Sequence, residues 1–131
     1  MPPARGEGEV SQAERTASEN AIKTTVLDYF EGWWTGDQIR MERALHPDLA
    51  KRSLMKDGLS LDQDTAASMI DLTARGAGRR HAGDRIEELV FFEVDETMAT
   101  VKVRTGVYLE YLHLVRLREG WKILNALWRA M

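Results

Sequence analysis

The first third of the chain carries apolar residues at the spacing of an amphipathic helix. After Ser18, a residue type that caps helix N-termini, the apolar positions fall three or four residues apart. They are Ile22, Val26, Tyr29, Phe30 and Trp33. Leu27 and Trp34 widen this stripe, so we expect the helix to be covered over much of its circumference. Gly36 predicts its end.

Two shorter helices and a strand follow in the pattern. Asp37 can cap a second helix, which Pro47 stops. Residues 49–55 alternate loosely between apolar and polar and predict a short strand. A third helix is expected to begin at Asp62 or Asp64, because both residue types cap helices.

Residues 76–84 are rich in Gly and Arg and predict a flexible loop. After this segment apolar and polar residues alternate, which is the period of a strand. In the first strand one side is formed by Ile86, Val90, Phe92 and Val94. The next strand, residues 98–105, has Ala99, Val101 and Val103 on one face. YLHLVRL and WKILNALW predict two more strands joined by a hairpin, with Trp121 and Trp128 on opposite faces of the last one. The order predicts an α+β fold in which helices pack on one face of a curved, mostly antiparallel sheet.

Composition and charge restrict the partners. A chain of 131 residues has the size of one domain. Its net charge of −3 gives no electrostatic reason to expect nucleic acid, and no apolar run approaches the roughly 18 residues that span a bilayer. The absence of cysteine excludes disulfides and thiolate chemistry, and the N-terminus lacks the apolar core of a signal peptide. We therefore expect a cytoplasmic domain at residues 16–131 after a disordered tail at residues 1–15, with no nucleic-acid or membrane partner.

Three segments resemble one superfamily: YFEGWWTGD, ALHPDLAKRSL and YLHLVRLREGWKILNALW. In this order they resemble the NTF2-like superfamily over residues 18–130, most closely the branch labelled as lumazine-binding. That branch is a neighbour of the SnoaL-like polyketide cyclases and of ketosteroid isomerase. The resemblance implies a cone, in which a long curved sheet wraps around the first helix and three helices close an apolar hollow. It also implies a homodimer formed through the outer face of the sheet.

Tyr29 and His113 are the candidates for chemistry. The resemblance implies that Tyr29 matches the tyrosine with which ketosteroid isomerase donates a hydrogen bond to the developing oxyanion, and that His113 stands where that group has a second donor. His113 shares its side of the strand with Tyr111, so a regular strand would point both inward. The general-base carboxylate of that group has no counterpart here, because Ser53 and Leu54 occupy its place.

The remaining candidates for ligand binding are residues that the cone would bring near its hollow. They are Trp33, His46, Met69, Tyr111 and Asn125. Three of them also have an ordinary structural explanation: Trp33 as core, His46 as a helix-end residue, and Asn125 as a partner that orients His113. Arg79, Arg80 and His81 either meet an anionic ligand at the mouth or form a solvated loop. No ligand spacing supports a metal site, and no cofactor is implied.

Three functions fit these features. The first is a small-molecule-binding domain with a largely apolar conical pocket for a flat aromatic or pterin-like ligand. The alternative is a cofactor-independent isomerase, cyclase or dehydratase that acts on a carbonyl compound through His113 and Tyr29. The third is a dimerisation domain with a filled core. A carboxylate in the cavity would favour the enzyme, and the sequence pattern places none there, which favours binding.

Overall fold

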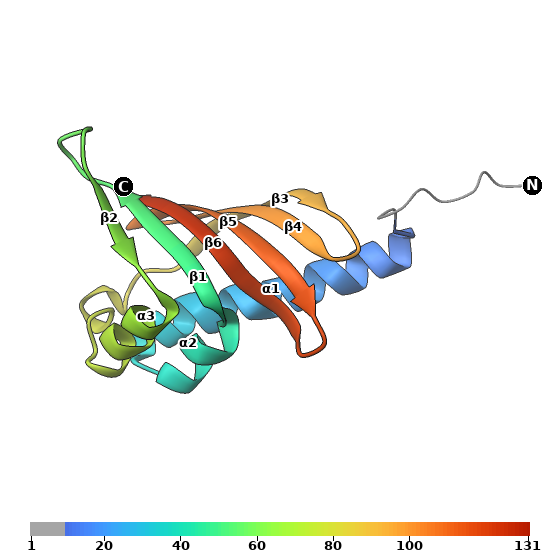
Figure 1. Cartoon of the computed structure of the whole chain (residues 1–131), viewed down its shortest axis with the longest axis horizontal. Helices are drawn as coiled ribbons and strands as arrows, with labels where there is room; N and C mark the ends of the chain where they lie inside the picture. Colours follow the sequence, from blue (N-terminus) through green and yellow to red (C-terminus); the bar gives the residue numbers. More distant parts are fainter. Residues whose placement is uncertain (1–9) are drawn as a thin grey trace, which may run out of the picture.

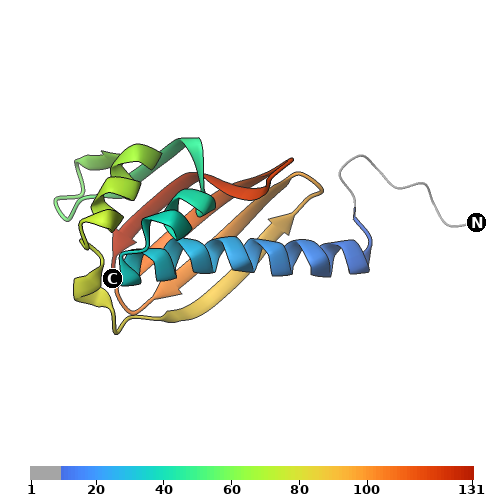
Figure 2. The same cartoon turned by 90° about the horizontal axis from the view of Figure 1, so that it is seen from below.

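A long helix, α1 (Gln12–Thr35), crosses the concave side of a curved sheet in the computed structural model, which describes residues 10–131 (Figures 1 and 2). The side chain of Ser11 caps its first turn by accepting from the backbone N–H of Glu14. Gly36 ends it with φ at 74°, a left-handed conformation that favours glycine. Residues 12–15, predicted as tail, are therefore helical, and the rest of that predicted tail up to residue 9 lies outside the described residues.

Two short helices lie beside the C-terminal half of α1 (Figure 2). In α2 (Gln38–Ala44) the Asp37 side chain accepts from two backbone N–H groups, which confirms the predicted cap. In α3 (Ala66–Ala74) the cap is Thr65, in a reciprocal capping box with Ser68. The predicted caps Asp62 and Asp64 instead belong to a strand, β2 (Leu61–Asp64), that the sequence pattern did not reveal.

Within residues 10–131 the sheet has six strands. They are β1 (Leu45–Leu54), β2 (Leu61–Asp64), β3 (Ile86–Val94), β4 (Met98–Thr105), β5 (Tyr108–Leu117) and β6 (Gly120–Ala130). Their order is β2-β1-β6-β5-β4-β3, and every neighbouring pair is antiparallel except β1 and β6, which are parallel. The predicted meander is confirmed, and the loop predicted before it contains a short 3₁₀ helix, η1 (Arg79–His81).

Three single-residue bulges, in β3 and β6, bend the sheet around α1, and a further register shift lies between Leu45 and Ala50 in the β1–β6 pairing. The register skips one residue at Glu87 and one at Phe92 in β3, and one at Leu124 in β6. Each extra residue increases the local bend and twist and reverses which face the following side chains occupy.

These bulges overturn two predictions made from regular alternation. The predicted face of Ile86, Val90, Phe92 and Val94 does not exist as one face, because Ile86 and Val94 pack with the core whereas Val90 pairs with Lys102, on the other side of the sheet from the buried Val101 and Val103. Phe92 is the bulged residue and is 54% exposed. Trp121 and Trp128 do not lie on opposite faces, because Leu124 is inserted between them. Both tryptophans pack against the core on the concave side. This core is formed mainly by α1, α2 and the inner face of the sheet.

A buried carboxylate joins α1 to α2. Asp28 receives hydrogen bonds from the Arg40 Nε at 3.0 Å and from two nitrogens of Arg43 at 2.8 Å each. The Asp28 side chain is 7% exposed, whereas both arginines reach solvent. The hydrogen bond from Arg43, first, and that from Arg40 lower the pKa of Asp28, although burial opposes them. Arg43 binds the Asp28 carboxylate through two hydrogen bonds, and this bidentate contact fixes the angle between α1 and α2.

We expect Asp28→Asn to lower the free energy of unfolding by about 2 kcal/mol at pH 7, measured by urea titration, because two arginines lose their anion. Since the folded-state pKa of Asp28 lies below its unfolded value, its stabilisation is complete above about pH 4 to 5 and is lost as the pH falls toward the folded pKa. The difference between the two proteins should therefore shrink in acid. Asp71→Asn is the matched control, because the Asp71–Arg75 pair is exposed and should change stability little. A constant difference down to pH 2 would contradict this account.

Candidate functional site

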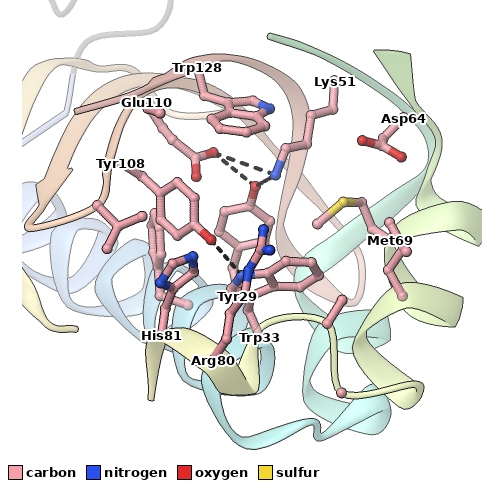
Figure 3. Close-up of a pocket in the computed structure, with 16 residues that line it drawn as sticks. Tyr29, Trp33, Lys51, Asp64, Met69, Arg80, His81, Tyr108, Glu110 and Trp128 are labelled. Atoms are coloured by element: carbon pink, nitrogen blue, oxygen red, sulfur yellow. Dashed lines mark hydrogen bonds and ion pairs between the residues drawn. The ribbon is translucent and has the colours of Figure 1, made fainter. Parts of the chain in front are cut away.

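A cavity of about 620 Å³ lies between α1, α3, the loop that contains η1 and the concave face of the sheet (Figure 3). Its size is in the range of small-molecule pockets. Aromatic rings form much of its wall: Tyr29, Phe30, Trp33, Tyr108 and Trp128. The space inside the cone is therefore lined by rings without being filled by them.

Three ionisable side chains from three different elements meet in this cavity (Figure 3). Tyr29 comes from α1, Lys51 from β1 and Glu110 from β5, and their exposed fractions are 2%, 6% and 2%. Strand alternation explains the last two. Lys51 lies between the outward-facing residues of β1, and Glu110 shares the inner face of β5 with Tyr108 and Leu112.

The three groups form a continuous hydrogen-bonded chain. The Tyr29 hydroxyl donates to Glu110 Oε1 at 2.8 Å, and the Lys51 ammonium donates to the Tyr29 hydroxyl oxygen. Lys51 Nζ lies 3.9 Å from Glu110 Oε1, which makes them an ion pair as well. The Lys51 nitrogen also lies 4.8 Å from the ring centre of Tyr29 and 5.3 Å from that of Trp128, positions that favour a cation.

Burial shifts the pKa values at the two ends of this hydrogen-bonded chain in opposite directions. Burial raises the pKa of Glu110, although Lys51 and the hydrogen bond from Tyr29 oppose the change. Burial lowers the pKa of Lys51, against the attraction of Glu110 and Asp64. The pKa of Tyr29 is raised well above its usual value, first by burial and then by Glu110, so Tyr29 remains protonated. The energetic difference between the ion pair and the neutral pair is therefore smaller here than in water.

The loop after α3 lines one side of the cavity. There Trp33 donates from Nε1 to the Tyr108 hydroxyl at 3.0 Å, and the ring of His81 meets Tyr108 edge-on at 5.8 Å. Gly78 lies so close to Trp33 that a Cβ at this position would collide with the Trp33 carbonyl oxygen. Arg80 and His81 line the cavity. The loop is thus packed against α1.

The structure brings together three of the residues that the sequence predicted for the site. Tyr29, Trp33 and Met69 all line the cavity. His46 lies outside it, beside Ile70 at a separate depression, where its Nδ1 accepts from the backbone N–H of Asp48.

The predicted inward direction of Tyr111, His113 and Asn125 is wrong. All three are exposed on the outer face of the sheet, where Asn125 Nδ2 lies 3.3 Å from His113 Nδ1. His113 and Tyr111 face outward because β5 buries the alternate set of residues, and Asn125 because the bulge at Leu124 reverses its face. The expected contact between Asn125 and His113 exists, but away from the cavity.

Sequence reasoning missed Lys51, Tyr108 and Glu110. On β5 the apolar pattern favours the wrong face, since the truly inward set contains the charged residues Glu110 and Arg116. The signal that identifies the correct face is the preceding strand. Val101 pairs with Leu112, so the inward assignment of Val101 places Leu112 and Glu110 inward once the turn is set at residues 106–107.

Two further properties of the described residues bear on function. Within residues 10–131, no group of three or more His, Asp or Glu side chains is placed to hold a metal ion. No helix in that range combines the length and apolarity of a membrane span.

A curved, unclosed, mostly antiparallel sheet of six strands, with three helices over its hollow side, makes this an NTF2-like domain, also called a cystatin-like fold. The chain belongs to the family described as "Putative lumazine-binding", whose sequence model matches residues 17–129. The family and the fold expected from the three sequence segments are thereby confirmed. A comparison with curated proteins finds no match.

Solved structures support the fold. An NTF2-like protein of unknown function from Silicibacter pomeroyi is 16% identical over 93% of this chain and 100% of its own, with a TM-score of 0.65. An NTF2-like protein with a cystatin-like fold from Novosphingobium aromaticivorans is 12% identical over 92% and 86%, with a TM-score of 0.71. One of unknown function from Shewanella baltica is 12% identical over 94% and 98%, with a TM-score of 0.69. At these identities the likeness establishes the fold alone.

The buried cluster yields a stability prediction. We expect Lys51→Met and Glu110→Gln each to lower the free energy of unfolding by about 3 kcal/mol at pH 8, because each leaves a buried polar group without its partner. The double variant should lose clearly less than the sum, with a coupling of about 1 kcal/mol or more. Chemical denaturation of the four proteins measures this cycle.

The matched control is the partly exposed ion pair of Lys102 and Glu88, in which Lys102 Nζ lies 2.7 Å from Glu88 Oε1. The same substitutions there should couple by less than about 1 kcal/mol. Additive losses at Lys51 and Glu110 would mean that the two groups do not interact in the folded protein.

Proposed function

We propose that this protein binds a flat, partly aromatic small molecule in the cone. The observation that carries the proposal is the cavity of about 620 Å³, walled by aromatic rings and holding one buried polar cluster. Rings supply stacking area, and a few polar groups in an apolar pocket fix the orientation of a ligand. Membership of a family described as lumazine-binding supports the same class of ligand.

The free hydrogen-bonding capacity of the cluster suggests the edge that the ligand presents. An ammonium has three N–H donors, and Lys51 uses one of them on Tyr29. Within residues 10–131, the hydrogen bonds of the Glu110 carboxylate use only Oε1, which leaves Oε2 as an acceptor. A donor beside an acceptor complements a lactam edge, in which a carbonyl oxygen lies next to an N–H group. Pteridinediones such as lumazine carry this edge on a flat ring.

Tyr29 then has a different role from the one expected from the sequence. Its single hydroxyl proton already goes to Glu110, so it holds the cluster in place instead of donating to a ligand. The alternative of an isomerase, cyclase or dehydratase working through His113 and Tyr29 fails in that form, because His113 is on the outer face. Glu110 and Asp64 are carboxylates that line the cavity, which is the feature that favours an enzyme, so a catalytic version would use Glu110 together with Lys51.

Titration of the protein with lumazine, followed by tryptophan fluorescence and calorimetry, tests the binding proposal. We expect saturable binding that quenches emission, since Trp33 and Trp128 line the cavity. Unsubstituted pteridine, which has the rings without the lactam edge, should bind about tenfold or more weakly. Lys51→Met should remove this preference, whereas Lys56→Met, at an exposed turn, should not. Equal binding of both compounds by the unaltered protein would contradict the lactam proposal, and absence of binding by either would contradict the ligand class.

A homodimer through the outer face of the sheet is the second part of the proposal. Large apolar side chains gather on this face: Phe92, Met98, Tyr111 and Leu127 are 54%, 60%, 42% and 53% exposed. The rings of Phe92 and Tyr111 stack with their centroids 6.5 Å apart, and Tyr111 pairs with Leu127 on the next strand. Exposed apolar side chains grouped on one face of a sheet are typical of an interface.

We expect the protein to be dimeric by light scattering during size-exclusion chromatography, and Tyr111→Glu to yield a monomer, because a charge at the centre of an apolar interface loses its hydration. Ile39→Glu is the control, since Ile39 is 68% exposed but lies on α2, away from the sheet. It should leave the dimer intact. A monomeric unaltered protein would refute this part of the proposal without affecting the cavity.

A further inference from the structure

Lys51 is placed unlike the other lysines of the chain. Of the five lysines in the sequence, all of which lie within the described residues, Lys51 alone is buried. Its amine lines the cavity, where it meets the faces of two aromatic rings. A compact amine in a desolvated pocket is the setting in which a lysine side chain reacts with carbonyl compounds.

We propose that Lys51 forms an imine with an aldehyde or ketone ligand in the cavity. This inference rests on the proposed function, because it requires that the cavity admit a small molecule. It adds a covalent step to that function and assigns the ligand a reactive carbonyl group.

The hydrogen-bonded chain supplies the neutral amine that such a step needs. Lys51 already donates to the Tyr29 oxygen, and Tyr29 already donates to Glu110. A shift of both protons along these bonds converts the ammonium and the carboxylate into a neutral amine and a carboxylic acid, and Tyr29 ends unchanged. Burial favours this shift at both ends, since it lowers the pKa of Lys51 and raises that of Glu110.

The same groups balance the reaction. The amine lone pair forms the C–N bond while the carbonyl π electrons move to oxygen, and transfer of one N–H proton to that oxygen gives a neutral carbinolamine. The acid form of Glu110 then protonates the hydroxyl, which leaves as water while the nitrogen lone pair forms the C=N bond. The sum is an ammonium plus a carbonyl giving a protonated imine plus water. The product cation lies beside the Glu110 carboxylate and over the rings of Tyr29 and Trp128.

Reductive trapping tests this inference directly. The protein is incubated at neutral pH with 2-naphthaldehyde and sodium cyanoborohydride, which reduces an imine to a stable secondary amine, and the product is analysed by intact mass and peptide mapping. We expect one naphthylmethyl group at Lys51, introduced at least about tenfold faster than at any other lysine. Lys51→Arg should abolish this modification, and Lys56→Arg should not change it. Glu110→Gln should slow it, because the amide cannot accept the proton from Tyr29, and circular dichroism checks that this variant is folded.

A second measurement separates failure of the covalent step from failure of the binding proposal. 2-Naphthalenemethanol has the same rings but no carbonyl, and tryptophan fluorescence reports its binding. Binding of the alcohol without modification of Lys51 by the aldehyde would overturn the imine and leave the ligand pocket standing. Modification spread evenly over several lysines would also overturn it. The peptide map of the unaltered protein decides the point even where a variant does not fold.

Discussion

The curvature of the sheet is the constraint on which the other features of this protein depend. Each bulge adds one residue to one strand, so the sheet bends around α1 and leaves a hollow between them. The bulge at Leu124 also turns Trp128 inward, where its ring lies beside Tyr108 and faces the amine of Lys51. A flat sheet would press against the helix and leave no enclosed space for polar groups to share.

Within that hollow the balance of charge is unusual for a core. A buried lysine and a buried glutamate are each unfavourable alone, and their attraction offsets the loss of hydration only when the geometry is good. Tyr29 improves the geometry, because its hydroxyl accepts from one group and donates to the other. Replacing the pair by apolar side chains of similar size is often neutral or stabilising in proteins. Its presence here is therefore better explained by the ligand binding that we propose than by stability.

The sequence predicted the parts of the fold that are decided locally. The long helix, the cap at Asp37 and the meander follow from side-chain period and from capping chemistry, which act over a few residues. The direction of side chains on β5 and β6 is decided by pairing between strands, and one inserted residue at Leu124 reverses it. The residues of the candidate site were harder to predict than the fold, because Glu110 breaks the apolar pattern of its own strand. Functional residues commonly violate the local rule, so pattern reasoning pointed to His113 on the opposite face.

The single parallel pairing, between β1 and β6, links the site to the order in which the chain is made. Lys51 is held opposite Ala126 by this pairing, which joins strands separated by most of the domain. Contacts so distant in sequence form late, after loop closure over many residues. During synthesis β1 cannot make this pairing before β6 has emerged, so the buried environment of Lys51 is completed only after that point. On the imine proposal, an amine that is still in water is mostly protonated at neutral pH and a poor nucleophile, so Lys51 gains its reactivity only when the fold is complete.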